Sequence, residues 1–376
     1  MRKVCYISGT RADFGLMKNT LLAIHQHVDL SLSVLVTGMH LLADYGETWR
    51  EIKDSGLAIG ATVPVDLTGG SGMEMAIALG IQITGFTQTL TDDRPDLLLL
   101  LGDRGEMLAG AIAALHLNIP IVHIHGGELS GTVDESIRHA ISKLAHYHFT
   151  ATEKSRERLI RMGEKPEHIF VTGAPGLDEI LKMTLLDRNK LMNRFGMDST
   201  RLFILVLFHP VVQQAKIAAK QIRAVLNAVI NCEEQGLVIM PNADAGGSEI
   251  EKVIAMLSKS NDLVTAVHVG REAFLSLVSY ADVMVGNSSS GIIEAASLGT
   301  SVVNIGDRQQ CRERNANVID VSPDETEISR AIREAQAMNV PRGRNVYGDG
   351  NASECIISEL LNLSLNPDVL EKVNTY

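Results

Sequence analysis

Short apolar runs alternate with segments of helical period along most of the chain. Up to residue 180 the pattern predicts seven strands, at 3–7, 32–37, 61–65, 96–101, 119–124, 147–151 and 169–172. Apolar residues three and four positions apart predict helices at 16–26, 41–55, 73–90, 106–117, 137–145 and 154–161. Strands that alternate with helices indicate a parallel sheet covered on both faces, and therefore one doubly wound domain.

The alternation stops in a polar, turn-bearing stretch from residue 173 to about 201 and then resumes. Five further strands are predicted at 202–208, 237–240, 263–268, 283–286 and 301–305, followed by an amphipathic helix at 352–365. A chain of 376 residues exceeds the size at which one hydrophobic core stops growing. We therefore expect an α/β fold of two Rossmann-like domains, at 1–180 and 181–350, and a closing helix in 351–376.

Composition and charge narrow the classes of partner. No apolar run reaches the roughly 20 residues that a membrane-spanning helix needs. The formal net charge of -11 argues against nucleic acid or an anionic membrane as a partner, because both require a basic surface. Residues 1–3 lead directly into a predicted strand without the apolar region of a secretory signal, so a cytoplasmic location is expected. The scattered cysteines are expected to be reduced: Cys5, Cys232, Cys311 and Cys355.

Two candidate motifs follow predicted strands of the first domain. Residues 8–15 read SGTRADFG, where backbone amides can face an anion and Arg11 adds a bidentate donor. Residues 101–106 read LGDRGE and place Asp103 and Arg104 at the carboxyl end of a buried strand. Asp103 is either functional or a cap of the next helix. Ligands of open α/β sheets bind beyond such strand ends, so both motifs are expected in one crevice.

The densest polar segment is HIHGGELSGTVDESIRH, residues 123–139. His123 and His125 alternate along a predicted strand and should face opposite sides, so a metal site is not expected. General acid/base chemistry fits better, because several acids and bases can converge in a cleft where their pKa values are tunable. These groups are Asp103, His125, Glu128 and Asp134. Thr132 or Asp134 can instead serve as a cap of the following helix.

The fourth motif is VGNSSSGIIE at residues 285–294, between a strand and a helix of the second domain. Successive serine hydroxyls and free amides at a helix start can form an anion cradle. Glu294 can accept hydrogen bonds from a ribose diol, or it can be a solvated residue on a capped helix. FHP at 208–210 and PN at 241–242 also end predicted strands of this domain and fit the same crevice.

Several common catalytic and cofactor motifs are missing. The chain has no GxSxG nucleophile motif, no Walker A sequence and no GxGxxG dinucleotide fingerprint. Serine-hydrolase chemistry, ATP-driven chemistry and a nicotinamide site are therefore disfavoured.

Together with TGMH at 37–40, these motifs resemble the hydrolysing UDP-N-acetylglucosamine 2-epimerases. The resemblance runs in order over about residues 10–310, and GELSGTVD at 127–134 separates the hydrolysing branch from the non-hydrolysing one. It implies the GT-B architecture, in which two Rossmann-like domains enclose the active site in a cleft. It also implies a C-terminal helix that packs back towards the first domain.

The resemblance implies release of UDP and conversion of the sugar to N-acetylmannosamine, for sialic acid biosynthesis. Close relatives act on UDP-N,N'-diacetylbacillosamine on the way to legionaminic acid. The implied partners are a UDP-sugar substrate and the UDP product, with no metal and no other cofactor. A homodimer or homotetramer, formed through helices of the first domain, is also implied.

The resemblance also assigns roles to individual residues. Catalytic roles fall on Asp103, Arg104, His125, Glu128 and Asp134. Contacts with UDP fall on Arg11, His209, Asn242, Val269, Ser288, Ser289, Glu294 and Arg308. Contacts with the sugar fall on Asp13, His40 and Arg138.

One position departs from the family's pattern. The chain has HIHGGE where HIEGGE is expected, so His125 replaces a carboxylate that takes part in proton transfer. The C2 base is therefore open between His125, Glu128 and Asp103. Arg104 is expected to orient Asp103 or a phosphate.

Three other functions remain open. A GT-B glycosyltransferase would share the UDP cradle but transfer the sugar to an acceptor, and a non-hydrolysing epimerase would keep UDP on its product. A nucleotide-sugar-binding regulator without activity is the third, although such a protein has no need of Asp103 and Asp134 together in the crevice.

Overall fold

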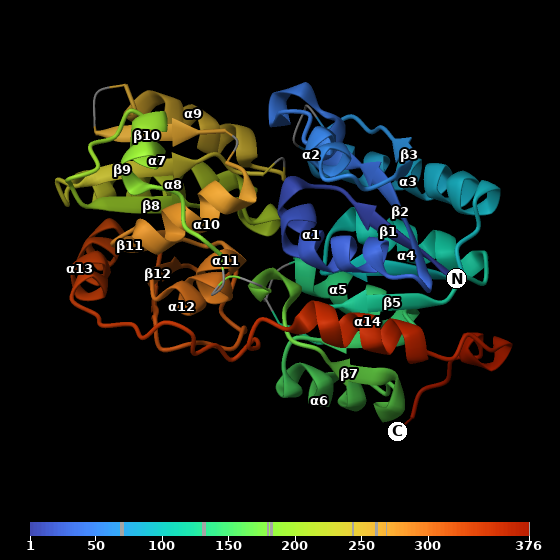
Figure 1. Ribbon diagram of the computed structural model, residues 1–376. Helices are drawn as coiled ribbons and strands as arrows, with labels where there is room; N and C mark the ends of the chain where they lie inside the picture. The colour runs from blue at the N-terminus through green and yellow to red at the C-terminus, as the bar shows by residue number, and fades with distance from the viewer. Residues whose placement is uncertain are drawn as a thin grey trace.

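The computed structural model describes residues 1–375 except 68–70, 130–132, 179, 181–182, 243, 260–261 and 268. Two parallel sheets form two lobes, and the first contains β1 (Arg2–Ser8), β2 (Leu30–Thr37), β3 (Ile59–Val63), β4 (Leu97–Leu101), β5 (Ile121–Ile124), β6 (Tyr147–Thr150) and β7 (Ile169–Val171). Its helices are α1 (Arg11–Gln26), α2 (Trp49–Asp54), α3 (Gly72–Asp92), α4 (Gly105–His116), α5 (Val133–Leu144) and α6 (Glu153–Arg161). Figure 1 shows this lobe with both chain termini.

The second lobe repeats this plan. Its strands are β8 (Phe203–Leu207), β9 (Gln235–Ile239), β10 (Leu263–Ala266), β11 (Val283–Gly286), β12 (Ser301–Ile305) and β13 (Val318–Val321). Its helices are α7 (Arg188–Arg194), α8 (Ala218–Ile230), α9 (Gly247–Leu257), α10 (Arg271–Tyr280), α11 (Ser289–Ile292), α12 (Glu294–Leu298) and α13 (Glu325–Gln336). Two parallel α/β units confirm the predicted fold class. The domain boundaries at 180 and 350 stay a prediction.

The strand order creates one crevice in each lobe. The first sheet runs β3-β2-β1-β4-β5-β6-β7 and the second β10-β9-β8-β11-β12-β13. Successive strands are therefore added to one side of β1 and then, from β4 onward, to its other side. The same change of side occurs between β8 and β11 in the second sheet. Ligands of open α/β sheets bind outside the carboxyl ends of strands at such a switch point. The loops after β1, β4, β8 and β11 carry four of the predicted motifs, so the topology places these four at the two switch points.

Alternation along the central strands builds a core on each face of each sheet. In β1, Val4 and Tyr6 pack on one face, whereas Cys5 and Ile7 pack on the other. In β8, Phe203, Leu205 and Leu207 likewise face the opposite side from Ile204 and Val206. Strands buried on both faces read as continuous apolar runs, which is why the sequence revealed them so clearly.

The helix predicted at 41–55 is wrong. The segment forms two 3-10 turns, η1 (Gly38–Leu41) and η2 (Ala43–Tyr45), before α2 begins at Trp49. Gly46 and Glu47 both have positive φ, at 84° and 46°, and left-handed backbone cannot continue an α-helix.

Several elements after residue 173 were also not predicted individually, among them the helices α8, α9, α10 and α13. The polar stretch after residue 173 contains η4 (Pro175–Leu177) and α7, whose N-terminus is capped by Asp187 accepting the Lys190 amide at 2.9 Å. The strand β13 was not predicted. It pairs only with β12 at the sheet edge and is half exposed, so its apolar pattern is short.

The C-terminal segment returns to the first lobe. The helix α14 (Ala352–Asn362) lies against α1, and Figure 1 shows it in red across this lobe. Ile356 and Leu360 are fully buried in the core of the first sheet. Asp178 lies where the chain first passes from the first lobe to the second. It accepts the Ala352 amide at 2.8 Å and the Ser353 amide at 2.6 Å. One carboxylate therefore links the two segments that connect the lobes, at the start of α14.

A buried carboxylate also holds the end of the chain against α5. Glu164 lies 2.6 Å from the amines of both Lys143 and Lys372 and 3.0 Å from His148 Nε2. Lys372 also donates to the Ser142 carbonyl at 3.0 Å, in the last turn of α5. This cluster anchors the C-terminal end of the helix that carries Asp134 and Arg138. No helix of the described residues is long and apolar enough to cross a membrane.

Replacement of Glu164 by Gln tests this anchor. Burial alone would raise the pKa of Glu164, but hydrogen bonds from His148, Lys143 and Lys372 lower it from 4.5 to about 2. The ionised carboxylate therefore stabilises the fold above its ordinary pKa, and this contribution is lost as the pH falls towards the folded value. We expect Glu164→Gln to lower the free energy of unfolding near neutral pH by about 1–3 kcal/mol. Its stability should also fall less steeply in acid.

Denaturant unfolding at a series of pH values measures both effects. Glu371→Gln is the control, because Glu371 is exposed beside the same anchor. Equal acid sensitivity of Glu164→Gln and the wild type would contradict the assignment.

Candidate active site

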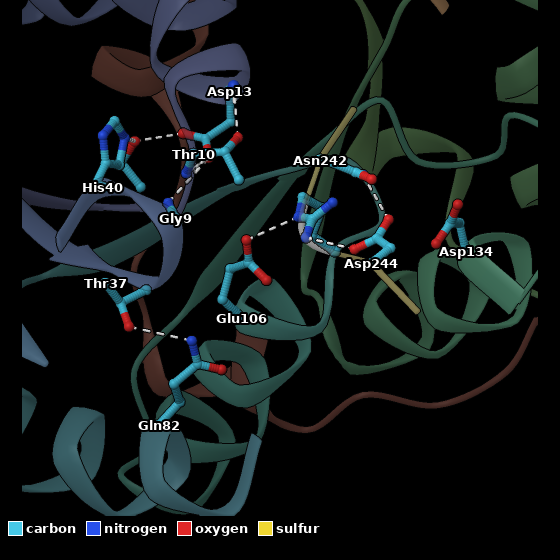
Figure 2. A network of polar contacts seen from close by, with 12 residues as sticks. Gly9, Thr10, Asp13, Thr37, His40, Gln82, Glu106, Asp134, Asn242 and Asp244 are labelled. Atoms are coloured by element: carbon cyan, nitrogen blue, oxygen red, sulfur yellow. Dashed lines mark hydrogen bonds and ion pairs between the residues drawn. The ribbon is translucent and has the colours of Figure 1, made fainter. Parts of the chain in front are cut away.

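The loop after β1 is organised by a carboxylate of its own. Asp13 Oδ2 accepts the amides of Gly9 and Thr10 at 2.9 and 2.6 Å, and Asp13 and Thr10 form a capping box at the start of α1 (Figure 2). Asp13 therefore occupies the Gly9 and Thr10 amides, and anion binding by other amides of this loop stays a prediction. Burial raises the pKa of Asp13 despite these hydrogen bonds.

His40 belongs to the same buried network. Its Nε2 lies 3.0 Å from Ser8 Oγ, its Nδ1 lies 2.8 Å from Thr48 Oγ1, and Ser8 also contacts Asp13. Burial lowers the pKa of His40 to about 4, so the ring is neutral at physiological pH. Asp13 and His40 therefore support the loop after β1 through buried hydrogen bonds. The contacts with the sugar that the sequence assigned to them stay a prediction.

Arg11 follows this cap as the first residue of α1. Its Nη1 is buried and has no hydrogen-bond partner in the described part of the chain. Burial lowers its pKa, as does the nearby Arg271. A buried guanidinium donor without a partner is costly, so this position favours an anionic ligand.

The loop after β4 sends two charged side chains to different partners. Asp103 forms an ion pair with Arg138 of α5, whose side chain is only 1% exposed. Arg104 lies at the N-cap position of α4 but donates to Glu106 Oε1 at 2.9 Å and to Asp244 Oδ1 at 3.1 Å. The capping alternative for Asp103 is therefore wrong. The expectation that Arg104 orients Asp103 is also wrong, because Arg138 does so.

The contact between Arg104 and Asp244 joins the two lobes. Figure 2 shows Glu106, Asp244 and Asn242 as one chain of polar contacts, with Asp134 apart from it. Asn242 donates to Asp244 Oδ2 at 2.6 Å. Burial would raise the pKa of Asp244, but Arg104 and Arg308 lower it, so the carboxylate stays ionised.

The loop after β5 contains His125, Gly126, Gly127 and Glu128. β5 ends at Ile124, and His125 has φ of 63°, so the expectation that His125 alternates along a strand is wrong. His125 Nδ1 lies 2.7 Å from Glu128 Oε1, and Glu128 also forms an ion pair with Arg312 of the second lobe.

His123 lies on β5 and is fully buried. Its Nδ1 lies 3.0 Å from Ser142 Oγ and its Nε2 2.7 Å from the Gly102 carbonyl, and burial lowers its pKa to about 3. The neutral ring therefore supports the loop that carries Asp103. Thr132, considered as a cap, lies outside the described residues.

Asp134 opens the first turn of α5 and faces the second lobe. Its Oδ2 lies 3.7 Å from Arg308 Nη2. The side chains of Asp103 and Asp134 are 23% and 25% exposed, whereas that of Glu128 is 3% exposed. Asp103 and Asp134 are therefore more exposed between the lobes than Glu128 is.

In the second lobe, the loops after β8 and β11 are tied to each other. The His209 amide donates to Asn287 Oδ1 at 2.7 Å, and Asn287 Nδ2 donates back to the His209 carbonyl at 2.8 Å. His209 Nδ1 accepts the Asn242 amide at 3.3 Å, and burial followed by Arg308 lowers the His209 pKa to about 3. The ring is neutral, so its Nε2 carries the proton and can donate to a ligand.

The serine turn is a helix cap in this structure. Ser288 is the N-cap of α11 and lies 2.9 Å from Ser290 Oγ, while Ser289 is partly exposed. Glu294 is buried and paired with Arg271, so the alternative of a solvated glutamate is wrong. Val269 is fully buried in the core beside α10.

Four residues at the cleft were missed by sequence reasoning: Glu106, Asp244, Arg271 and Arg312. Asp244 follows the PN motif by two residues and could have been found there. Arg312 lies after β12 in a segment with no recognisable motif, so only tertiary structure identifies it. No three metal-ligating side chains gather within the described residues.

A family model described as UDP-N-acetylglucosamine 2-epimerase matches residues 22–361. The chain belongs to this family. It is 49% identical over 378 residues to the hydrolysing UDP-N,N'-diacetylbacillosamine 2-epimerase of Legionella pneumophila, covering 100% of both chains. It is 34% identical to the UDP-N-acetylglucosamine 2-epimerase of Neisseria meningitidis, covering 98% of this chain and 96% of the relative. The family resemblance found in the sequence is thus confirmed.

The fold agrees with solved structures. The UDP-N-acetylglucosamine 2-epimerase of Neisseria meningitidis, solved with UDP-N-acetylglucosamine, superposes with a TM-score of 0.80 at 22% identity, covering 96% of this chain and all of the other. At that identity the likeness supports the GT-B fold only.

Gly9 packs against Glu106 with no room for a side chain of its own. A Cβ at this position would lie 2.6 Å from Cγ of the buried Glu106, which holds Arg104. Gly9→Ala is expected to displace Glu106 and to destabilise the protein by about 1–3 kcal/mol. Denaturant unfolding measures the change.

Gly80→Ala in α3 is the matched control, because nothing lies within 4 Å of a Cβ there. Alanine is the better helix former, so this variant should be as stable as the wild type or more so. Equal stability of Gly9→Ala and the wild type would refute the packing argument.

Proposed function

We propose that this protein is a hydrolysing 2-epimerase of a UDP-linked amino sugar, and that the sugar is N,N'-diacetylbacillosamine. The observation that supports this substrate is the 49% identity to the Legionella pneumophila enzyme over the whole of both chains. The motifs of the sequence alone favour UDP-N-acetylglucosamine as substrate, with N-acetylmannosamine as product. That substrate is the second candidate, favoured by the 34% identical Neisseria meningitidis relative.

The proposed reaction is an elimination followed by hydration. A base removes the C2 proton, and the electrons of the C–H bond form a double bond between C1 and C2. The C1–O bond breaks at the same time, and the electron pair of that bond leaves with UDP. Water then adds across the double bond, so that C1 receives the hydroxyl and C2 receives a proton on the opposite face. UDP-sugar and water thus give UDP and the free 2-epimer. Each step needs an acid or base within hydrogen-bond reach of the sugar.

The cleft offers groups for each task. Asp103 and Asp134 are the partly exposed carboxylates, and we assign them to proton transfer at the sugar. Arg11 has an unpaired buried donor for a departing diphosphate, a role that Ser288 and Ser289 would share. Preorganised cationic donors of this kind stabilise the charge that develops on a leaving group.

The second lobe would hold the nucleotide. His209 can donate from Nε2, and Arg308 lies between Asn287 and Asp134. Glu294 is already engaged by Arg271, so a ribose contact would require the glutamate to share its second oxygen. Val269 would lie against the uracil, on the side of the ring that faces the hydrophobic core. The homodimer or homotetramer and the cytoplasmic location stay predictions.

The products formed from the two UDP-sugars test the proposal. The protein should convert UDP-N,N'-diacetylbacillosamine to UDP and a free sugar inverted at C2, as followed by NMR. Its kcat/KM should exceed that for UDP-N-acetylglucosamine about tenfold or more, a preference within reach of pocket contacts to one substituent. The reverse preference would select the second candidate. A product that keeps UDP, or release that needs an acceptor, would refute hydrolysis.

Neutral isosteres of the two cleft carboxylates test the proton transfers. Asp103→Asn and Asp134→Asn should each lower kcat by about 10²–10⁴, because amides can neither accept nor return the proton. UDP binding, measured by calorimetry, should persist in both variants. Asp54→Asn, at an exposed position on α2, is the control. A near wild-type kcat in either cleft variant would remove that residue from the mechanism.

A further inference from the structure

Glu128 stands between a histidine of the first lobe and an arginine of the second. Its Oε1 lies 2.7 Å from His125 Nδ1, and its Oε2 is paired with Arg312 Nη1. The carboxylate therefore spans the boundary between the lobes, with one oxygen for each partner.

The charge state of Glu128 separates it from the carboxylates that can move protons. Burial alone would raise its pKa, but Arg312, followed by His125, lowers it to about 2. Its side chain is 3% exposed and that of Arg312 is 8% exposed. A carboxylate held ionised and covered in this way is unsuited to exchange protons with a sugar near neutral pH. It can instead fix the orientation of its neighbour.

The backbone of His125 also fixes the position of its ring. The residue has φ of 63°, and its amide donates to the Phe149 carbonyl of β6 at 2.9 Å. A non-glycine residue in this region is held there at a cost by surrounding contacts, which is common at functional sites. With Nδ1 facing Glu128, the other ring nitrogen, Nε2, has no hydrogen-bond partner within the described residues.

Arg312 is itself anchored to the second sheet. Arg314 donates to the Arg312 carbonyl at 2.9 Å and is paired with Asp320 of β13 at 3.0 Å. Arg308, the cation facing Asp134, lies in the same segment after β12. The segment that reaches Glu128 is thus part of the lobe proposed to hold the nucleotide.

We propose that Arg312 is a positioning residue, which reaches across the cleft to hold Glu128 so that Glu128 fixes His125 with its Nε2 available to the sugar. This inference rests on the proposed function. It assigns Glu128 to positioning rather than proton transfer. It also couples the approach of the second lobe to the geometry of His125, since Arg312 can hold Glu128 only when the lobes meet.

Arg312→Gln tests the assignment in the full-length protein. Loss of the pair should lower kcat by about 100-fold, because small misplacements of a reacting group cost that much. KM and the affinity for UDP, measured by calorimetry, should change far less than kcat. Arg312→Lys keeps the charge and should recover part of the loss.

The matched control is Lys154→Gln. Lys154 forms another ion pair between the lobes, 3.6 Å from Glu313 in the segment next to Arg312, but it is 70% exposed. If any pair between the lobes mattered equally, this variant would lose kcat as well. We expect it to retain wild-type kcat.

A second measurement does not depend on turnover. The ¹⁵N shifts of the His125 ring, assigned by their absence in His125→Gln, report which nitrogen carries the proton. In the UDP-bound wild type we expect the proton on Nδ1, facing Glu128. We expect Arg312→Gln and Glu128→Gln to lose this preference.

The two measurements separate the possible failures. Should the wild type consume neither UDP-sugar, the proposed function fails, while the ring shifts still decide whether Arg312 orients His125. Unchanged ring shifts in a folded Arg312→Gln variant would overturn the inference, as would an unchanged kcat. A fall in UDP affinity as large as the fall in kcat would make Arg312 a nucleotide contact instead.

Discussion

Carboxylates of the first lobe and arginines of the second meet across the cleft, and the geometry of the site depends on these pairs. Asp134 faces Arg308, and Glu128 is paired with Arg312. Burying a charge costs several kcal/mol unless a partner and hydrogen bonds compensate it. Because each lobe supplies only one partner of such a pair, Glu128 and Arg312 compensate each other only when the two lobes meet.

The same need for compensation explains how each loop is held. Asp13 binds the amides of its own loop, and His123 supports the loop of Asp103 from the neighbouring strand. These supporting groups are buried, and hydrogen bonds occupy the Asp13 carboxylate and the His123 ring. Asp103 keeps a partner on one side, Arg138, and remains partly exposed on the other. Exposure and the number of partners thus distinguish Asp103 from the groups that support its loop.

The arrangement agrees with membership of the epimerase family. It also shows which groups surround His125. On the sequence alone, a histidine at a position expected to hold a carboxylate left the base undecided. In the structure it lies beside an ionised glutamate that is itself held by an arginine. A carboxylate 2.7 Å from Nδ1 restricts the orientation of the imidazole ring.

The two sheets, most of their strands, and the motif loops at the carboxyl ends of those strands could be predicted from the sequence. This was possible because strands buried on both faces are continuous apolar runs, and because glycine and polar residues must follow them where the chain turns. The sequence also placed Asp103 and Asp134 in loops or helix starts that follow strands, whereas their proposed roles stay predictions. Tertiary structure alone decided which charge meets which. Asp103 pairs with Arg138 rather than with its neighbour Arg104, and Arg312 reaches Glu128 from 184 positions away. Such pairs follow from strand order and the approach of two lobes, and no local pattern encodes either.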